Sequence, residues 1–213
     1  KQSVTKVLMT GLGGDNDPIR YSLSAIVQTG FPYRPIKGNQ HFERKNGDLT
    51  VTMSAPNDIG LPSGMYPRLA FVYICSQIVK TQSREVRLGS SLKKFVVDEI
   101  GRPWSTGKKG TATKWREAIT SLLATSFTIT EKYREDDKHE GLVLKNVTIA
   151  SDANLWWDTE FSELKGAEII VNESFADTLL KHATPLDVRA LKKLSELRSP
   201  LSFDLYCWLT FRF

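Results

Sequence analysis

The sequence predicts an α+β protein that contains a winged helix and the beginning of a second domain. Between Tyr66 and Ala124, three segments with a helical apolar period enclose one short strand-like run. Two longer strand-like runs with a charged tip between them follow, which is typical of a hairpin. The order helix, strand, helix, helix, hairpin is that of a winged helix, whose third helix enters DNA beside a two-stranded wing. Helical patterns return after residue 172, so we expect domains over residues 1–172 and 173–213.

The first forty residues are rich in Gly and Pro and carry only short apolar segments, so we expect an irregular N-terminal extension. Alternation of apolar residues with threonines predicts a strand over residues 48–56. A broad apolar face predicts a helix over residues 66–82, with Pro67 in the first turn, where a helix tolerates proline.

The remaining elements follow from caps, stops and periodicity. We expect a short strand over residues 84–89, a helix over 90–101, a helix over 111–124, hairpin strands over 126–135 and 141–151, and a strand from residue 166. A cap at Asn172 or Ser174 predicts a further helix. The Thr184-Pro185 and Ser199-Pro200 pairs each predict the start of another helix, because proline is favoured at the first helical position.

Composition narrows the class of protein. The chain has 213 residues, a net charge of +5 and 40% hydrophobic residues, which is ordinary for a globular protein and favours an anionic partner. Cys75 and Cys207 lie far apart in apolar runs, so we expect two buried thiols and a reducing, cytoplasmic setting. No apolar run is long enough to cross a membrane. The chain starts at Lys1 and ends at Phe213 within an apolar run, so we expect a fragment of a longer protein.

The strongest binding signal is the stretch "TGKKGTATKWREAITSLL". Five basic residues and no acidic residue lie between Arg102 and Arg116. A helix N-terminus also attracts phosphate through its free N–H groups and its dipole. The alternative is a solvated helix start. Trp115 falls on the apolar stripe of this helix, so we expect it in the core. The predicted first DNA contact surface is Lys108, Lys109, Thr111, Thr113, Lys114 and Arg116.

Two further basic groups could contact DNA. On the hairpin, Lys132, Arg134 and Lys138 would lie near backbone phosphates. A second basic stretch runs through the penultimate helix, and its alternative is a solvated helix face. Its members are Arg189, Lys192, Lys193 and Arg198.

Catalysis is not expected. The lysines of "GKKGT" are misplaced for a Walker loop, and no apolar strand leads into it. Asp15 and Asp17 could hold a divalent metal, but their Gly- and Pro-rich surroundings favour a turn. The three histidines are isolated. Trp156 and Trp157 could stack on bases, or they could pack on the edge of the hairpin. We expect no metal and no cofactor.

From about Phe31 onward the chain resembles the plasmid-encoded RepA-type replication initiators. The similarity is carried by Leu61, Pro62, Gly64, Tyr66, Pro67, Arg68, Leu69, Thr81, Ser83, Val86, Leu88, Gly89, Ser91 and Leu92. The segments "LWWD", "PLDVRALKKL" and "SPLSFDLYCWLTFRF" also look like family segments. The family's chain continues past this last helix, so the second DNA-binding module is incomplete here.

The resemblance implies a function. It implies tandem winged-helix domains, the second truncated, that bind repeated sites in the double-stranded DNA of a plasmid origin. It also implies recruitment of host replication proteins, namely an initiator and a helicase, together with homodimerisation and repression of the protein's own gene. Two other functions stay open: a transcriptional repressor of the same fold, and a metal-dependent replication enzyme such as a primase or nicking protein.

Overall fold

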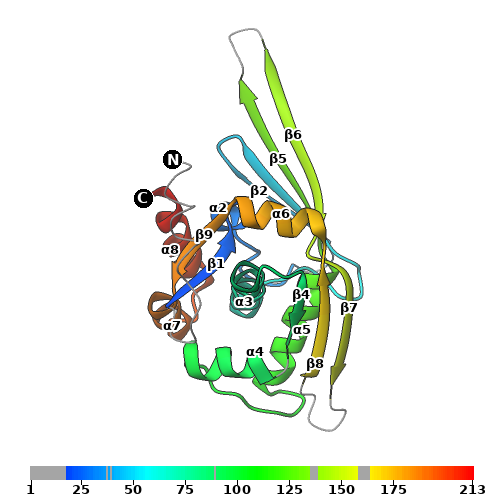
Figure 1. Ribbon diagram of the computed structural model, residues 1–213, viewed down its shortest axis with the longest axis vertical. Helices are drawn as coiled ribbons and strands as arrows, with labels where there is room; N and C mark the ends of the chain where they lie inside the picture. The colour runs from blue at the N-terminus through cyan, green and yellow to red at the C-terminus, as the bar shows by residue number, and fades with distance from the viewer. Residues whose placement is uncertain (1–17, 37, 39, 89, 135–138, 158–163) are drawn as a thin grey trace.

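Helix α3 (Met65–Thr81) lies at the centre of the molecule, surrounded by antiparallel sheets and shorter helices (Figure 1). The computed structural model describes residues 18–36, 38, 40–88, 90–134, 139–157 and 164–213. Most side chains of α3 are buried on all sides of the helix, as expected for a helix that is apolar all round. The expected helix over 66–82 is thereby confirmed, and the α+β class with it.

The largest sheet has four antiparallel strands in the order β2-β3-β5-β6. Their bounds are His41–Asn46, Leu49–Ser54, Ser126–Arg134 and Glu140–Thr148. The predicted strand over 48–56 and the predicted hairpin are confirmed. Strand β2 was not predicted, although Gly47-Asp48 is a two-residue hairpin loop and Gly47 has the positive φ of 61° that such a turn uses. The distal half of the β5–β6 hairpin projects beyond the body of the molecule (Figure 1).

A second sheet has the strand order β4-β8-β7. Its strands are Glu85–Arg87, Leu164–Val171 and Ala150–Trp157. The strand between the first two predicted helices, β4, therefore pairs with β8 and not with the β5–β6 hairpin. The prediction that β5–β6 stands as a wing beside the third helix is wrong, because pairing of β5 with β3 draws this hairpin into the four-stranded sheet.

Two helices follow β4. Helix α4 (Ser90–Lys94) continues as a π-helical segment, η1 (Phe95–Glu99), and these two elements occupy the expected helix over 90–101. Helix α5 (Thr111–Ala124) has the predicted bounds. The Trp115 side chain is 0% exposed and meets the Tyr66 ring edge-on, with 5.2 Å between ring centroids, so its predicted place in the core is confirmed.

A two-stranded sheet joins the two ends of the described chain. Strand β1 (Ile19–Leu23) pairs antiparallel with β9 (Ala183–Asp187), and helix α2 (Ser24–Thr29) follows β1. The prediction of a helix capped at Thr184 is wrong, because residues 183–187 adopt the extended form that pairing with β1 requires. Helix α7 (Val188–Glu196) starts after β9.

The last helices pack back onto the body. Helix α6 (Glu173–Lys181) is capped by Asn172, and α8 (Pro200–Arg212) is capped by Ser199 with proline in its first turn, as predicted. The carboxylate of Asp204 in α8 accepts hydrogen bonds from Arg68 Nε at 2.7 Å and Nη2 at 2.6 Å. Arg68 also donates to backbone carbonyls of residues 31, 32 and 64. This buried ion pair joins α8 to α3; the domain boundary at residue 172 stays a prediction.

Both cysteines, Cys75 and Cys207, are buried and free, as expected from their apolar surroundings. Burial raises the pKa of both thiols, so both are neutral at physiological pH. Among the residues that the structure describes, no helix is long and apolar enough to cross a membrane.

Candidate nucleic-acid interface

A hydrogen-bonded bracket fixes the loop over residues 101–110 to the first turn of α5. The Thr111 N–H donates to Ser105 Oγ at 3.0 Å, and the Ser105 N–H donates to Thr111 Oγ1 at 2.8 Å. The Thr111 hydroxyl in turn donates to the Pro103 carbonyl at 3.0 Å. The side chains of Ser105 and Thr111 therefore hold together the two ends of the segment that carries Lys108 and Lys109.

The middle of this loop is a tight turn. The Gly107 carbonyl accepts hydrogen bonds from the Gly110 N–H at 2.9 Å and the Thr113 hydroxyl at 2.8 Å. A Cβ atom at Gly110 would lie 2.5 Å from the backbone carbonyl oxygens of residues 105 and 106, so no larger residue fits without movement of the loop. Lys108 and Lys109 are thus exposed at the tip of a turn whose backbone is fixed on both sides.

The hydrogen bonds with Ser105 reduce the number of free N–H groups at the start of α5 that could bind an anion. The Ala112 N–H donates to the Ser105 carbonyl at 2.9 Å, and the Thr111 N–H is also taken. The expectation that free N–H groups of the helix attract phosphate is therefore wrong for these first two amides. Anion attraction at this end of α5 has to come mainly from the lysine side chains.

The predicted residues on α5 separate into two kinds. Lys114 is exposed, with its Nζ 5.9 Å from the centre of the Tyr66 ring. Thr113 is buried and donates to the Gly107 carbonyl, and Thr111 donates to the Pro103 carbonyl, so both hold the loop in place. Arg116 is half-buried, with its guanidinium 5.1 Å from the centre of the Trp157 ring. Trp157 and its neighbour Trp156 are both about half exposed.

Helix α7 docks on the start of the same loop. Arg102 Nη1 donates to the Ser195 carbonyl at 2.9 Å, and the Lys192 side chain lies against Gly101, where an added Cβ would be 2.7 Å from the Lys192 Cε. Lys192 and Lys193 are both exposed. The structure therefore brings part of the second predicted basic stretch to the same end of the molecule as the loop.

Two lysines that the sequence analysis missed belong to this end. Lys93 and Lys94 form the exposed last turn of α4, and Lys93 Nζ lies 6.0 Å from the centre of the Trp104 ring. The adjacent lysines in the predicted helix over 90–101 were the available signal. We call the exposed lysines at this end the basic platform; its members are Lys93, Lys94, Lys108, Lys109, Lys114, Lys192 and Lys193.

Other predicted cations lie elsewhere or are paired. Arg189 forms an ion pair with Asp187 at 2.5 Å; this pairing raises the pKa of Arg189 and lowers the pKa of Asp187. Arg198 is exposed just after α7, with a positive φ of 52°. Lys132 and Arg134 lie on the β5–β6 hairpin, at the opposite end of the molecule from α4 (Figure 1).

The hairpin cations also differ in their surroundings. Arg134 forms an exposed ion pair with Glu140 at 3.0 Å. Lys138 lies outside the described residues, as do Asp15 and Asp17. Among the described residues, no group of three or more His, Cys, Asp or Glu side chains could hold a metal ion.

Comparisons with known proteins agree with the resemblance seen in the sequence. A family model described as "Plasmid encoded RepA protein" matches residues 61–213, which is well over half of the chain. No curated protein matches the chain. Two crystal structures of domains 2 and 3 of RctB have a similar fold.

The first of these, of selenomethionine derivatives, has a TM-score of 0.58 at 15% identity and covers 88% of this chain and 71% of the other. The second has a TM-score of 0.57 at 14% identity and covers 88% and 69%. At such low identity the likeness concerns the fold alone. The family match identifies the chain as a member of the RepA-type family of plasmid replication initiators.

Proposed function

We propose that this chain binds the double-stranded DNA of a plasmid origin through the basic platform. The observation that carries the proposal is the loop over residues 101–110, whose hydrogen-bonded backbone presents Lys108 and Lys109 at the start of α5. A rigid backbone matters because less backbone entropy is lost when its lysines meet phosphates. A replication initiator must bind its origin, so the family membership supports the same partner.

We also infer a winged-helix unit made of α3, β4, α4 with η1, α5 and the β7–β8 hairpin. Support comes from the order of these elements and from the pairing of β4 with β8 in one sheet. The contact between Arg116 of α5 and Trp157 of β7 joins the helix to this hairpin. In this arrangement β7–β8 takes the part of the wing, and α5 takes the part of the recognition helix.

The first two turns of α5 carry two exposed side chains, Lys114 and Glu117, that can contact base edges. The same side of α5, from Lys114 to Ser121, borders a groove of about 370 Å³ whose other wall includes Ile36, Ile59 and Tyr66. Lys114 and Glu117 are exposed on the near side of that groove. A lysine suits the acceptors of guanine, and a glutamate suits the amino group of cytosine. We propose that these two side chains contribute to sequence recognition, while the other lysines of the basic platform bind phosphates.

Further partners are part of the proposal. By family resemblance, the chain helps to recruit a host initiator and helicase, forms homodimers and represses its own gene in the bacterial cytoplasm. No catalytic step of its own is included. A transcriptional repressor of the same fold is the second candidate, because the basic platform would serve a promoter equally well.

The test is to measure binding of the whole chain to labelled duplexes by fluorescence anisotropy. The duplexes are a repeat from the plasmid origin, the promoter of the gene and a scrambled sequence. We expect the origin repeat to bind about 10³-fold or more tightly than the scrambled duplex at physiological salt. Tighter binding to a single promoter palindrome would favour the repressor, and equal binding to all three would overturn sequence recognition.

The matched variants are Lys114→Ala and Lys45→Ala. Lys45 is exposed on β2, outside the basic platform. We expect Lys114→Ala to cost affinity for the origin repeat by about 1–3 kcal/mol, and Lys45→Ala to cost almost none. Equal losses from the two variants would remove α5 from the binding surface.

A further inference from the structure

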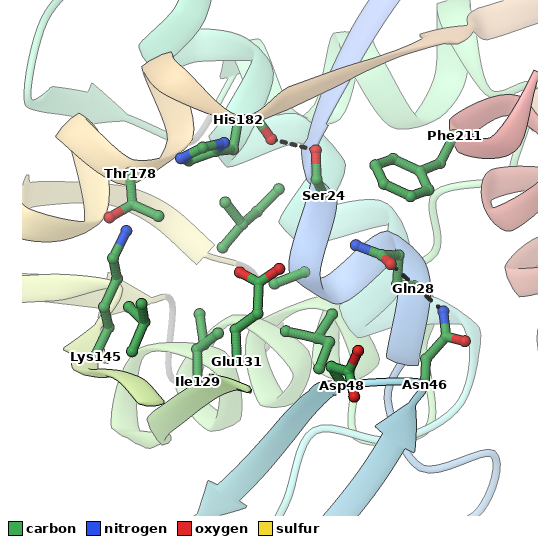
Figure 2. A pocket seen from close by; sticks show the side chains of 14 residues that line it. Ser24, Gln28, Asn46, Asp48, Ile129, Glu131, Lys145, Thr178, His182 and Phe211 are labelled. Atoms are coloured by element: carbon green, nitrogen blue, oxygen red, sulfur yellow. Dashed lines mark hydrogen bonds between the residues drawn. The ribbon is translucent and has the colours of Figure 1, made fainter. Parts of the chain in front are cut away.

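A cavity of about 450 Å³ lies between the base of the β5–β6 hairpin and the helices that cover it (Figure 2). Its walls come from α2, the β2–β3 turn, β5, β6, α6 and the end of α8. This volume is in the range of pockets that bind small molecules. No member of the basic platform lines the cavity, so a ligand in the cavity would not occupy the proposed DNA contact surface.

Charges of opposite sign line two sides of this cavity. Lys145, Thr178 and His182 lie on one side, Asp48 lies on the other, and Glu131 lies between them (Figure 2). Ile129 faces Lys145 in the strand register and Val143 faces Glu131, so Lys145 and Glu131 project from the same face of the sheet. Within the described part of the chain, the side chains of Glu131, Lys145 and His182 make no ion pair or hydrogen bond with one another.

The walls of the cavity are held together by hydrogen bonds between residues that line it. The carbonyl of His182 accepts hydrogen bonds from the Ser24 N–H at 2.9 Å and from the Ser24 hydroxyl at 2.5 Å. On the other side, the Asn46 amide donates to Gln28 at 3.4 Å, which ties the β2–β3 hairpin to α2. The wall elements are therefore already joined before a ligand binds, which reduces the entropic cost of binding.

The basic side of the cavity favours an anionic group. Burial, and then the positive charges of Lys145 and Lys181, lower the pKa of His182, while Glu131 acts in the opposite direction. An anion beside Lys145 would offset this repulsion. A simple anion would also meet the carboxylates of Glu131 and Asp48, and a simple cation would meet Lys145, so neither complements both sides.

We propose that this cavity binds a small zwitterion. Its anionic group would lie at Lys145, His182 and Thr178, and its cationic group would lie at Glu131 and Asp48. Leu49, Ile129 and Phe211 supply apolar surface for the carbon chain between them. Because these residues belong to the hairpin, α6 and α8, such a ligand also links the base of the hairpin to the C-terminal helices.

The experiment is an NMR titration of the His182 ring in the whole chain, with His182→Gln used to assign its signals among the three histidines. The probes are three zwitterions of increasing length, glycine, 4-aminobutyrate and 6-aminohexanoate, with butyrate and butylammonium as singly charged controls. We expect at least one zwitterion to shift the ring signals saturably and to raise the pKa of His182. The singly charged controls should bind about tenfold or more weakly, because each lacks one charge-assisted contact.

Lys145→Met and Glu131→Gln should each weaken the best zwitterion by about tenfold or more. Lys132→Met is the matched control, because Lys132 neighbours Glu131 on β5 but projects from the opposite face. Thermal melting of each variant checks that it is folded. The proposal is overturned if no zwitterion saturates the shift up to about 10 mM, tenfold above a millimolar dissociation constant. It is also overturned if butyrate binds as tightly as the best zwitterion, or if Lys132→Met weakens binding as much as Lys145→Met.

Discussion

The loop before α5 and the distal β5–β6 hairpin both carry cations close together in the sequence, yet these cations have different surroundings. In the loop, Lys108 and Lys109 lie in a stretch without acidic residues and on a backbone fixed by the Ser105–Thr111 bracket. On the hairpin, Arg134 is paired with Glu140. From this comparison we expect that the number of cations alone does not define a phosphate-binding surface, because the partners of the cations and the rigidity of the backbone also determine the charge available to DNA.

The two regions also differ in how much they contribute to the core. Substitution of a core residue should have the largest effect on stability. Trp115 of α5 is fully buried, whereas Tyr133 of the hairpin is 51% exposed. Trp115→Ala should lower the free energy of unfolding by about 3–5 kcal/mol, because it leaves a large cavity. Tyr133→Ala should change it by no more than about 0.5 kcal/mol, as for an exposed site. Urea unfolding measures both, and a similar loss from the two variants would show that the hairpin is part of the cooperative core.

Ion pairs give a second contrast between the body and the hairpin. The Arg68–Asp204 pair is buried, with side chains 1% and 16% exposed, and Arg68→Met should cost about 3–5 kcal/mol because it leaves a buried carboxylate unpaired. The Arg134–Glu140 pair is 65% and 70% exposed, so Arg134→Ala should cost between 0 and about 1 kcal/mol. Denaturant midpoints of the two variants provide the measurement.

A control shows whether the loss at Arg68 comes from the unpaired charge. The double variant Arg68→Met with Asp204→Leu should recover part of the stability, since no buried carboxylate then remains. If the double variant is no more stable than Arg68→Met alone, the loss comes from the backbone carbonyls that Arg68 bonds and not from Asp204.

A smaller effect, on DNA affinity, should distinguish the contribution of the rigid loop backbone from that of the loop charges. Gly110→Ala places a Cβ against the carbonyls of residues 105 and 106, so the bracket has to open. We expect weaker DNA binding, by about 1–2 kcal/mol, with the charge of the protein unchanged. Gly38→Ala is a control with a positive φ of 71° and no neighbouring atom within 4 Å, and it should leave DNA affinity unchanged. Unchanged affinity in Gly110→Ala would mean that the bracket is not needed.

The smallest effect concerns pH. The pKa of His182 is lowered in the folded state from the usual 6.5. Between the folded and unfolded pKa values the unfolded chain binds more protons, so stability rises with pH through this window and is constant above it. His182→Gln should remove this rise, seen as a flatter dependence of the melting temperature on pH below about 6.5. A profile identical to that of the parent would mean that another group titrates.

Local signals predicted much of this fold, because α5 carries an apolar stripe and α8 carries a serine cap followed by proline. Helix α5 follows Gly110 with the predicted bounds, and Ser199-Pro200 starts α8 as expected. The Thr184-Pro185 pair has the same local signal, yet it lies in a strand, because β1 supplies a pairing partner far away in the sequence. Nothing local reveals such a partner, and the same limit explains why the hairpin joined β3.

The candidate site also has features that the sequence predicted and features that only the structure reveals. The lysines of the basic loop were visible in the sequence as a run without acidic residues. The docking of α7 beside Arg102 depends on a tertiary contact, so the second basic stretch could not be assigned from spacing. The bonding of Thr111 with Ser105 depends on the conformation of the loop between them, which spacing does not reveal. Lys93 and Lys94 could have been included, because they lie within the predicted helix over 90–101.

The most direct test of the central claim is the salt dependence of DNA binding in two matched double variants. Lys108→Ala with Lys109→Ala removes the loop cations, and Lys132→Ala with Arg134→Ala removes those of the hairpin. Each phosphate contact contributes about −0.9 to the slope of log affinity against log salt, so the loop variant should be flatter by about 1.8. We expect the hairpin variant to keep the slope of the parent. A hairpin variant that flattens the slope as much as the loop variant, or a loop variant that leaves it unchanged, would contradict the account.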